Sequence, residues 1–187
     1  MLENSVSGSW YAVHTRRQHE KVTAQILQNK GYEIFLPLYI ARHKWSDRIK
    51  RITLPLFPGY VFVRESLGRW LQILTTPGVC GIVGCAGRPV AIPYPEIEAV
   101  RRIVESALSV EPHPYLKQGD SVRIKCGPLA GLQGILIRKD KQTRLVISVE
   151  MLGRSAAVDV DVACVERIAP TTGVQTDRPR HLERQIA

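Results

Sequence analysis

No stretch of the 187-residue sequence is apolar over the roughly 20 residues that a membrane-spanning helix needs. Residues 1–5 lack the basic and apolar segments with which a signal peptide begins. The sequence also lacks a phosphate-binding GxxxxGK loop, a catalytic nucleophile motif and any metal-ligand spacing of histidine and cysteine. We therefore expect a soluble cytoplasmic protein that acts by binding, without membrane contact, enzymatic activity, metal or other cofactor.

Cysteine is scarce. The four cysteines, Cys80, Cys85, Cys126 and Cys164, include no Cys-x-x-Cys pair, and the five histidines do not lie near them at zinc-ligand spacing. Since the cytoplasm keeps thiols reduced, we expect four free thiols. Cys80 and Cys85 fall in strand-like sequence and are predicted to be small core residues.

Acidic residues are few as well. The chain has 17 Asp and Glu against 26 Lys and Arg, which gives a formal net charge of +9 and a pI near 9.7. Positive charge favours a polyanionic partner, because binding nucleic acid releases condensed counterions. Many basic proteins bind no specific nucleic acid, so charge alone does not decide the matter. The hydrophobic content of 44% is ordinary for a chain that folds around a core.

The most informative segment is residues 55–63, PLFPGYVFV, in which a Pro-Gly turn opens an aromatic and β-branched run. Pro58 cannot donate to a β-ladder and must lie at the start of the strand, and the residues after it suit the centre of a sheet. Alternation places Tyr60 and Phe62 on one face and two valines on the other. One face is expected to pack on helices, and the other is either core as well or an aromatic surface for a partner.

A helix is predicted after a short strand at residues 10–14. Thr15 and Gln18 have the spacing of a capping box, and the helix then runs to about Lys30. Gly31 is placed to supply a left-handed C-terminal cap. The predicted apolar stripe comprises Val22, Ile26 and Leu27.

Two arginines fall in the first turn of this predicted helix. Arg16 and Arg17 lie where the backbone amides already carry partial positive charge, which is unfavourable unless an anion binds. We predict a contact with a nucleic-acid phosphate there, with His19 nearby. The alternative is a solvated pair of arginines.

The remaining N-terminal segments complete an α+β pattern. Residues 32–38 alternate as a strand, and residues 40–54 form a basic hairpin that turns near Ser46. Trp45 at its tip is a candidate contact for a nucleic acid or a partner, and the alternative is a solvated charged hairpin. Strands interleaved with helices predict an α+β sandwich with a mostly antiparallel sheet. The later elements are a short helix capped by Ser66, strands at 79–83 and 89–92, and a helix that starts near Pro95.

Beyond residue 110 the periodicity changes. Residues 110–114 are predicted to form a stiff linker because of their prolines, and the polar residues from 169 onward are predicted to be disordered. Between them, β-branched runs separated by turn residues predict a small, permanent β-barrel of about 50 residues. Its predicted strands are 122–125, 135–137, 145–149 and 156–162.

Four short motifs in a fixed order resemble the NusG family of transcription elongation factors. They are WYAV at 10–13, the segment 55–63, TPGV at 76–79, and the stretch from Gly119 to Gly134. The resemblance spans roughly residues 9–168. It implies an α+β fold in which an N-terminal antiparallel sheet flanked by helices, the NGN domain, precedes an SH3-like β-barrel, the KOW domain. The implied parts are a disordered N-terminus at 1–8, an NGN-like domain at 9–108, a linker at 109–116, a KOW barrel at 117–168 and a disordered tail at 169–187.

The resemblance also implies a partner. Members of this family bind the clamp helices of bacterial RNA polymerase through the first domain and bridge the polymerase cleft, which reduces pausing and termination. The residues that match the family's clamp-helix pocket are Trp10, Tyr11, Phe57, Pro58, Tyr60 and Phe62, and those that would face the opposite jaw are Thr75, Thr76 and Pro77.

Residues 14–20 and 45–48 look more like those of specialised paralogues such as RfaH. In those proteins the matching basic segment lies near the non-template DNA strand, so the resemblance implies DNA contacts for Arg16, Arg17, His19 and Thr76. The implied KOW loop comprises Gly127, Pro128, Gly131 and Gly134, and it would recruit the termination factor Rho or a small-subunit ribosomal protein. A monomer is expected. Two alternatives stay open: the housekeeping elongation factor of the same family, and an RNA-binding or ribosome-associated KOW protein.

Overall fold

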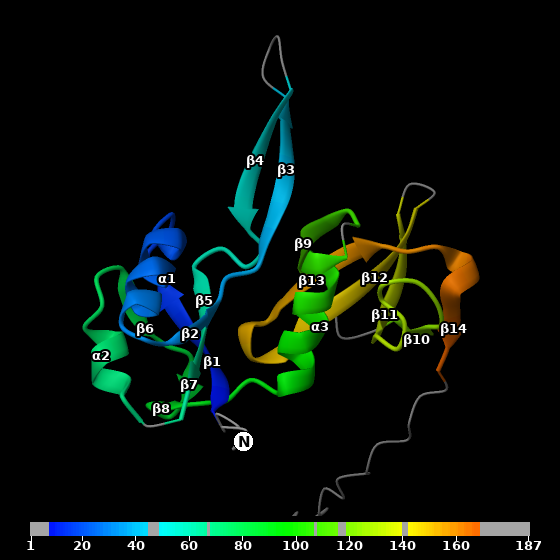
Figure 1. Cartoon of the computed structure of the whole chain (residues 1–187). Helices are drawn as coiled ribbons and strands as arrows, with labels where there is room; N and C mark the ends of the chain where they lie inside the picture. The colour runs from blue at the N-terminus through cyan, green and yellow to red at the C-terminus, as the bar shows by residue number, and fades with distance from the viewer. Residues whose placement is uncertain are drawn as a thin grey trace, which may run out of the picture.

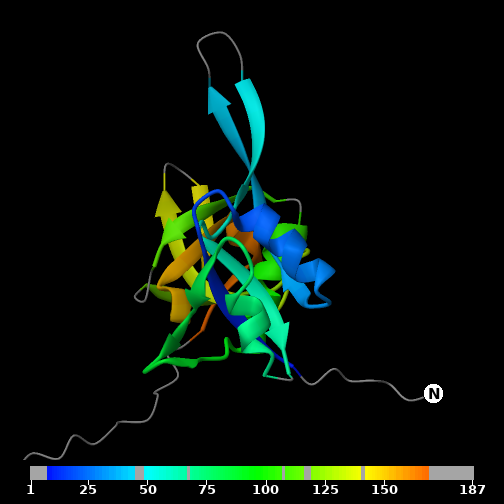
Figure 2. The same ribbon diagram turned by 90° about the vertical axis from the view of Figure 1, so that its left-hand side faces the viewer.

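The computed structural model describes residues 8–44, 49–66, 68–106, 108–115, 119–139 and 142–168. The chain forms an N-terminal sheet with helices, a two-stranded arm, and a C-terminal β-domain that we call the barrel (Figures 1 and 2). The segments predicted to be disordered are 1–8 and 169–187, and apart from Gly8 they lie outside the described residues.

The N-terminal sheet has four strands in the order β2-β5-β1-β6. Their bounds are β1 Ser9–Thr15, β2 Glu33–Phe35, β5 Tyr60–Glu65 and β6 Val79–Ile82. All the pairings are antiparallel, and β5 lies between β1 and β2. The prediction of a central strand after Pro58 is therefore confirmed.

The two faces of β5 enter different hydrophobic clusters. Val61 and Val63 belong to the cluster under α1 (Glu20–Asn29) and α2 (Trp70–Leu74), together with Leu27 and Ile73. Phe62 belongs to a second cluster, which contains residues of α3 (Tyr94–Glu105). In Figure 1, α1 and α2 lie on one side of the sheet and α3 on the other. The predicted alternation is confirmed, and both faces are covered.

Three predictions about the helices were wrong. Helix α1 begins at Glu20, because Thr15 stays in β1 with its N–H donating to the Gly59 carbonyl, and Gln18 has a φ of 65° that no helix accepts. Val22 is 58% exposed and so is not part of the buried stripe. The N-cap of α2 is Arg69, not Ser66. The left-handed cap at Gly31 is confirmed, with a φ of 84°.

The predicted basic hairpin is confirmed as an arm of two strands. Strand β3 (Leu38–Lys44) pairs antiparallel with β4 (Ile49–Pro55), and the arm projects from the body in both views (Figures 1 and 2). Its predicted turn, with Trp45, lies outside the described residues.

A smaller hairpin joins β7 (Gly84–Cys85) and β8 (Arg88–Pro89). Cys80 and Cys85 are exposed, so the prediction that they are core residues was wrong.

The barrel is an antiparallel sheet of six strands in the order β14-β10-β11-β12-β13-β9. Two 3-10 helices interrupt the chain, η1 (Glu150–Leu152) and η2 (Val162–Cys164). This part of the chain is built on one six-stranded sheet, which confirms the predicted all-β character of the barrel. The strands are β9 Val110–Pro114, β10 Asp120–Ile124, β11 Gln133–Lys139, β12 Gln142–Val149, β13 Arg154–Asp159 and β14 Val165–Arg167.

The predicted linker at 110–114 is instead strand β9, which pairs with β13. Its prolines are tolerated because β9 lies at the edge of the sheet, where N–H groups facing outward need no partner strand. Glu111 holds the strand in place by an ion pair with Arg144 of β12, which also pairs with Asp159 at 2.8 Å. Burial alone would lower the pKa of Arg144, but the contacts with the two carboxylates outweigh it and raise that pKa.

Helix α3 lies between the sheet and the barrel (Figure 1). One continuous hydrophobic cluster contains Trp10 and Phe62 of the sheet, Val100 of α3, and Leu145 and Ile147 of the barrel. Across this contact Glu96 of α3 accepts a hydrogen bond from the backbone N–H of Glu150. The pKa of Glu96 is raised, mainly by burial. The hydrogen bond from Glu150 opposes this rise, and the negative charge of Glu150 adds to it. The two parts of the chain are therefore packed together.

Candidate functional site: an aromatic face, a basic turn and a glycine loop

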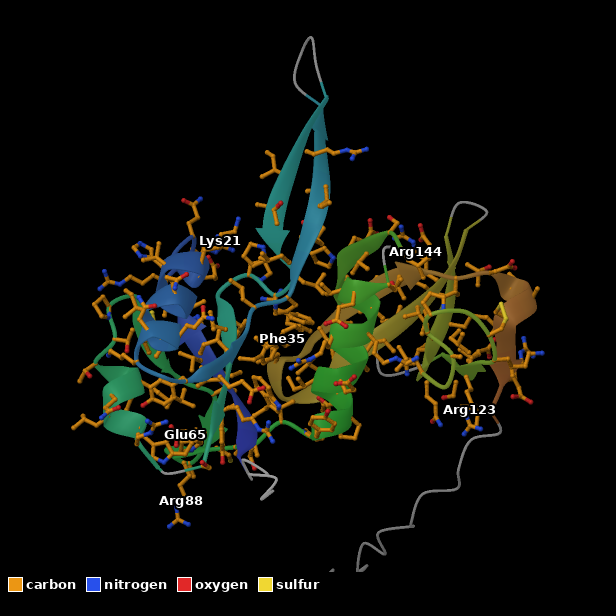
Figure 3. The ribbon with its side chains drawn as sticks, in the orientation of Figure 1. Lys21, Phe35, Glu65, Arg88, Arg123 and Arg144 are labelled. Carbon is orange, nitrogen blue, oxygen red and sulfur yellow. A yellow bond between two sulfur atoms is a disulfide. The ribbon has the colours of Figure 1, made fainter. Side chains whose placement is uncertain are left out.

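Four aromatic side chains gather on the α3-facing side of the N-terminal sheet. Phe35 stacks on Phe62 with ring centroids 5.9 Å apart, and Phe57 meets Phe62 edge-on at 5.8 Å. Trp10 meets Phe35 edge-on at 6.4 Å. The Arg101 guanidinium of α3 lies 5.1 Å from the Phe35 ring centroid, within range of a cation–π interaction. Figure 3 shows Phe35 between the sheet and α3. We call these four residues the aromatic face.

The structure separates the residues predicted to bind polymerase. Trp10, Phe57 and Phe62 are buried in the aromatic face, and half-buried Tyr60 packs against it. Tyr11 points to the opposite face of the sheet, where it meets Trp70 edge-on at 4.7 Å. Phe35 and Arg101 were missed from the sequence, because only the pairing of β2 with β5 and the seating of α3 bring them to this place.

The segment from Arg16 to His19, which we call the basic turn, precedes α1 and is exposed. The prediction that its arginines occupy the first helical turn was therefore wrong. Two hydrogen bonds fix the turn to Gly59. The Thr15 N–H donates to the Gly59 carbonyl at 2.8 Å, and the Gly59 N–H donates to the buried Glu20 carboxylate at 2.7 Å. Gly59 has a φ of 84°, so the Pro-Gly turn before β5 positions the basic turn.

A cavity of about 420 Å³ opens beside the basic turn. Lys21, labelled in Figure 3, closes one side by donating from Nζ to the Thr53 carbonyl of β4 at 2.8 Å. Cationic groups thus border a partly apolar hollow between α1 and the arm. The lining residues are Arg17, Gln18, Glu20, Lys21, Tyr39, Thr53, Leu54, Pro55 and Pro58.

The loop predicted to face the second jaw lies next to the basic turn. Arg16 N–H donates to the Gly78 carbonyl at 2.8 Å, which ties the two segments together. Thr75 and Pro77 are exposed, but Thr76 is 2% exposed. Its hydroxyl donates to the Gln72 carbonyl and accepts from Lys30 Nζ. Thr76 therefore supports the loop, and a direct contact with a partner would need the loop to open.

The glycines of the predicted KOW loop have two different roles. Gly127 and Gly131 have φ values of 82° and 86°, so they permit a turn that other residues adopt with strain. Gly134 lies within β11, where a Cβ would stand 2.5 Å from the Val146 carbonyl oxygen. The loop contacts α3, because Arg102 donates to the carbonyls of Pro128 and Ala130 at 3.1 and 2.7 Å.

Cys126, just before this loop, forms a disulfide with Cys164. The prediction of four free thiols was therefore wrong for this pair, and Cys80 and Cys85 are the ones with free thiols. The spacing of 38 residues gave no signal, since it is the pairing of β10 with β14 that brings the two cysteines together.

The described residues contain neither a metal-binding cluster nor a membrane-spanning helix. Among them, no three or more His, Cys, Asp and Glu side chains are grouped so that they could hold a metal ion. The helices formed by these same residues include none with the length and apolar character needed to cross a membrane.

Comparison with known proteins places the chain in a family. The family model described as "Transcription termination factor nusG" matches residues 8–101. The transcription termination/antitermination protein NusG of Staphylococcus aureus is 31% identical, over 90% of this chain and 100% of the relative. NusG of Halalkalibacterium halodurans is 29% identical, over 86% of this chain and 98% of the relative.

A solved structure on domain interaction in Thermotoga maritima NusG shares the fold. Its TM-score is 0.53 at 23% sequence identity, and the match covers 88% of this chain and 99% of that one. The likeness extends over both the N-terminal sheet and the barrel. With its family match and its full-length relatives, the chain belongs to the NusG family.

Proposed function

We propose that this NusG-family protein is a transcription elongation and antitermination factor that binds the clamp helices of bacterial RNA polymerase through its aromatic face. The observation that carries the proposal is the gathering of Trp10, Phe35, Phe57 and Phe62 on one side of the sheet, with Tyr60 at the margin. Buried aromatic anchors dominate the energy of protein interfaces, and a helical partner offers an apolar ridge that fits between them.

Access to this face is controlled within the chain. Phe57 and Phe62 belong to the cluster that continues through α3 into the barrel. A polymerase helix can therefore reach them only after α3 and the barrel have shifted. Under this proposal polymerase binding competes with barrel docking, and the polymerase favours the open form by its greater affinity for it.

The basic turn and the adjoining loop supply the second contact of the proposal. Arg16, Arg17 and His19 are exposed and would contact the non-template DNA strand, while Thr75 and Pro77 would face the opposite jaw of the cleft. Because the Arg16 N–H donates to the Gly78 carbonyl, the segment proposed to contact DNA and the loop proposed to face the jaw are held to each other. A protein that bridges the cleft disfavours its opening, which reduces pausing and termination.

The KOW loop is the proposed site for a second partner, either Rho or a small-subunit ribosomal protein. Arg102 engages two of its carbonyls while the barrel is docked, so this partner too would bind the open form. The exposed basic turn suits a specialised, RfaH-like member of the family. A factor that works on the bacterial polymerase acts in the cytoplasm, as a monomer under this proposal.

Two tyrosines give a matched test of the polymerase proposal. Tyr60 and Tyr11 are both half-buried and lie in neighbouring strands, but on opposite faces of the sheet. Co-purification of bacterial RNA polymerase is expected to fall about tenfold or more for Tyr60→Ala, as for loss of an interface hot spot, and to change little for Tyr11→Ala. Equal capture by two folded variants would contradict the assignment to the aromatic face, and no capture by the wild type would contradict polymerase binding itself.

Arginine substitutions test the DNA contact. Replacing Arg16 and Arg17 by Ala is expected to weaken binding of a single-stranded oligonucleotide and to reduce the slope of log affinity against log salt by about 1.4, since each phosphate contact on a single strand contributes about 0.7. Polymerase capture should stay unchanged. The control replaces the exposed Arg88 and Arg154, which removes the same charge elsewhere. A salt slope like that of the control would refute the contact.

A further inference from the structure

The disulfide lies at the end of the ladder between β10 and β14. Cys126 lies two residues after the end of β10, and Cys164 ends η2 directly before β14. The backbones meet at this point, where Lys125 N–H donates to the Cys164 carbonyl at 2.7 Å. The bond joins segments 38 residues apart in sequence, so it closes most of the barrel into a covalent loop.

Strand β14 has few contacts besides the disulfide: Arg167 forms an ion pair with Asp120 at 3.2 Å, and the Ile168 N–H donates to the Ser121 carbonyl at 2.9 Å. The strand has three residues, lies at the edge of the sheet, and pairs with β10 over Val122, Arg123 and Ile124. A ladder this short frays readily, because each residue of an edge strand has a neighbouring strand on one side alone. The disulfide is therefore the covalent part of the attachment of β14 to the barrel, beside the short ladder and these few contacts.

The same bond borders the loop that docks on α3. Gly127 follows Cys126, and the loop is closed by a hydrogen bond from Gly131 N–H to the Ile124 carbonyl at 2.7 Å. Arg102 donates from one nitrogen to the carbonyls of Pro128 and Ala130, so it needs both at set positions. Freedom gained at Cys126 would spread those carbonyls over many positions and weaken this contact.

We propose that Cys126–Cys164 is a thiol-exchange site, open to small intracellular thiols, that sets how firmly the barrel is docked on α3. Cys126 is exposed and Cys164 partly buried, so a thiolate attacks the Cys126 sulfur and forms a mixed disulfide with it, while Cys164 leaves as a thiolate and takes up a proton. A second thiol then releases Cys126. In total, two small thiols become one disulfide, and the protein gains two electrons and two protons.

This inference goes beyond the proposed function and does not depend on it. Attack by a small thiol needs a sulfur that solvent can reach. Cys126 is exposed and offers one, whereas Cys164 packs partly against the core cluster. The oxidised form would favour the docked barrel, and the reduced form would favour the open one.

The test uses the full chain equilibrated with glutathione at a series of reduced-to-oxidised ratios. Thiol content is read by alkylation and mass spectrometry, and amide hydrogen exchange is followed at 94–105, 127–132 and 165–167. Reduction is expected to speed exchange about tenfold in all three segments. Oxidised Arg102→Ala should show the effect at 94–105 and 127–132 but not at 165–167. A double variant, Cys80→Ser with Cys85→Ser, should respond like the wild type.

Two results would overturn the proposal. One is a pair that stays oxidised in a large excess of reduced glutathione, which would make the bond a structural link. The other is a pair that is reduced while exchange at 94–105 and 127–132 does not change, which would uncouple the bond from docking. Both are read on the wild-type chain, so neither depends on whether a variant folds.

Discussion

Replacing Gly134 by Ala is expected to lower the free energy of unfolding of the barrel by about 3 kcal/mol, at the upper end of the range for overpacked sites. An added Cβ would lie 2.5 Å from the Val146 carbonyl oxygen and 2.9 Å from Ile147 Cδ1. A side-chain end can rotate away, but the carbonyl belongs to β12, with which β11 pairs from Ile135 to Lys139, directly after Gly134. The methyl group must therefore push the two strands apart.

Gly131→Ala is the matched control. This glycine has a φ of 86°, but among the described residues no heavy atom outside its immediate chain neighbours lies within 4 Å of an added Cβ. The substitution costs only the strain of a left-handed backbone, about 1 kcal/mol. Urea unfolding followed by circular dichroism measures both variants. Equal losses would show that β11 and β12 accommodate the added methyl group at little cost, so that their close approach does not require a glycine at 134.

The strand after Pro58 could be predicted because its signals were local and agreed with one another. A proline that cannot donate, a glycine for the turn and strict alternation all indicate the same element, and the structure places β5 at the centre of its sheet. The barrel strands were predictable for the same reason. Their β-branched runs alternate with turn residues, and the four predicted strands correspond to β10, β11, β12 and β13, whereas β9 and β14 were missed.

The errors arose where distant contacts outweighed local preference. Thr15 and Gln18 have capping-box spacing, yet the hydrogen bond from Thr15 to Gly59 keeps the chain in β1. Residues 110–114 look like a linker, but β13 recruits them as an edge strand and Arg144 binds Glu111. The disulfide likewise depends on strand pairing. Each of these outcomes is set by residues far away in the sequence.

The aromatic face shows the same division. Its aromatic residues in β1 and β5 could be named from the sequence, Phe62 from the alternation of its strand and Trp10 from the resemblance to the family. Phe35 could not, since β2 has three residues and its register depends on pairing with β5. Nor could the sequence indicate that α3 joins this face to the barrel. The apolar positions of α3 predict a buried helix, but the cluster it enters runs through both parts of the chain.

Phe62→Ala is expected to lower the free energy of unfolding by about 3–5 kcal/mol, the usual cost of removing a buried phenylalanine ring from a core. Phe62 is fully buried and contacts both Phe35 and Phe57, so the cavity would open in the middle of the aromatic face. Because the same cluster continues through α3 into the barrel, the loss should also loosen docking. Amide exchange in α3 should then rise more than global unfolding explains.

The neighbouring Val63 provides the control that distinguishes these two effects. It is equally buried, but it lies in the other cluster, under α1 and α2. Val63→Ala should cost about 2 kcal/mol through the loss of two methyl groups and the cavity they leave, and should leave exchange in α3 unchanged once global unfolding is subtracted. If both substitutions loosened α3 to the same degree, docking would follow overall stability, and the aromatic face would have no special link to the barrel. If only Phe62→Ala loosens α3, then the same side of β5 anchors the barrel and forms the surface proposed for polymerase. The barrel and the polymerase could then not occupy that surface at the same time.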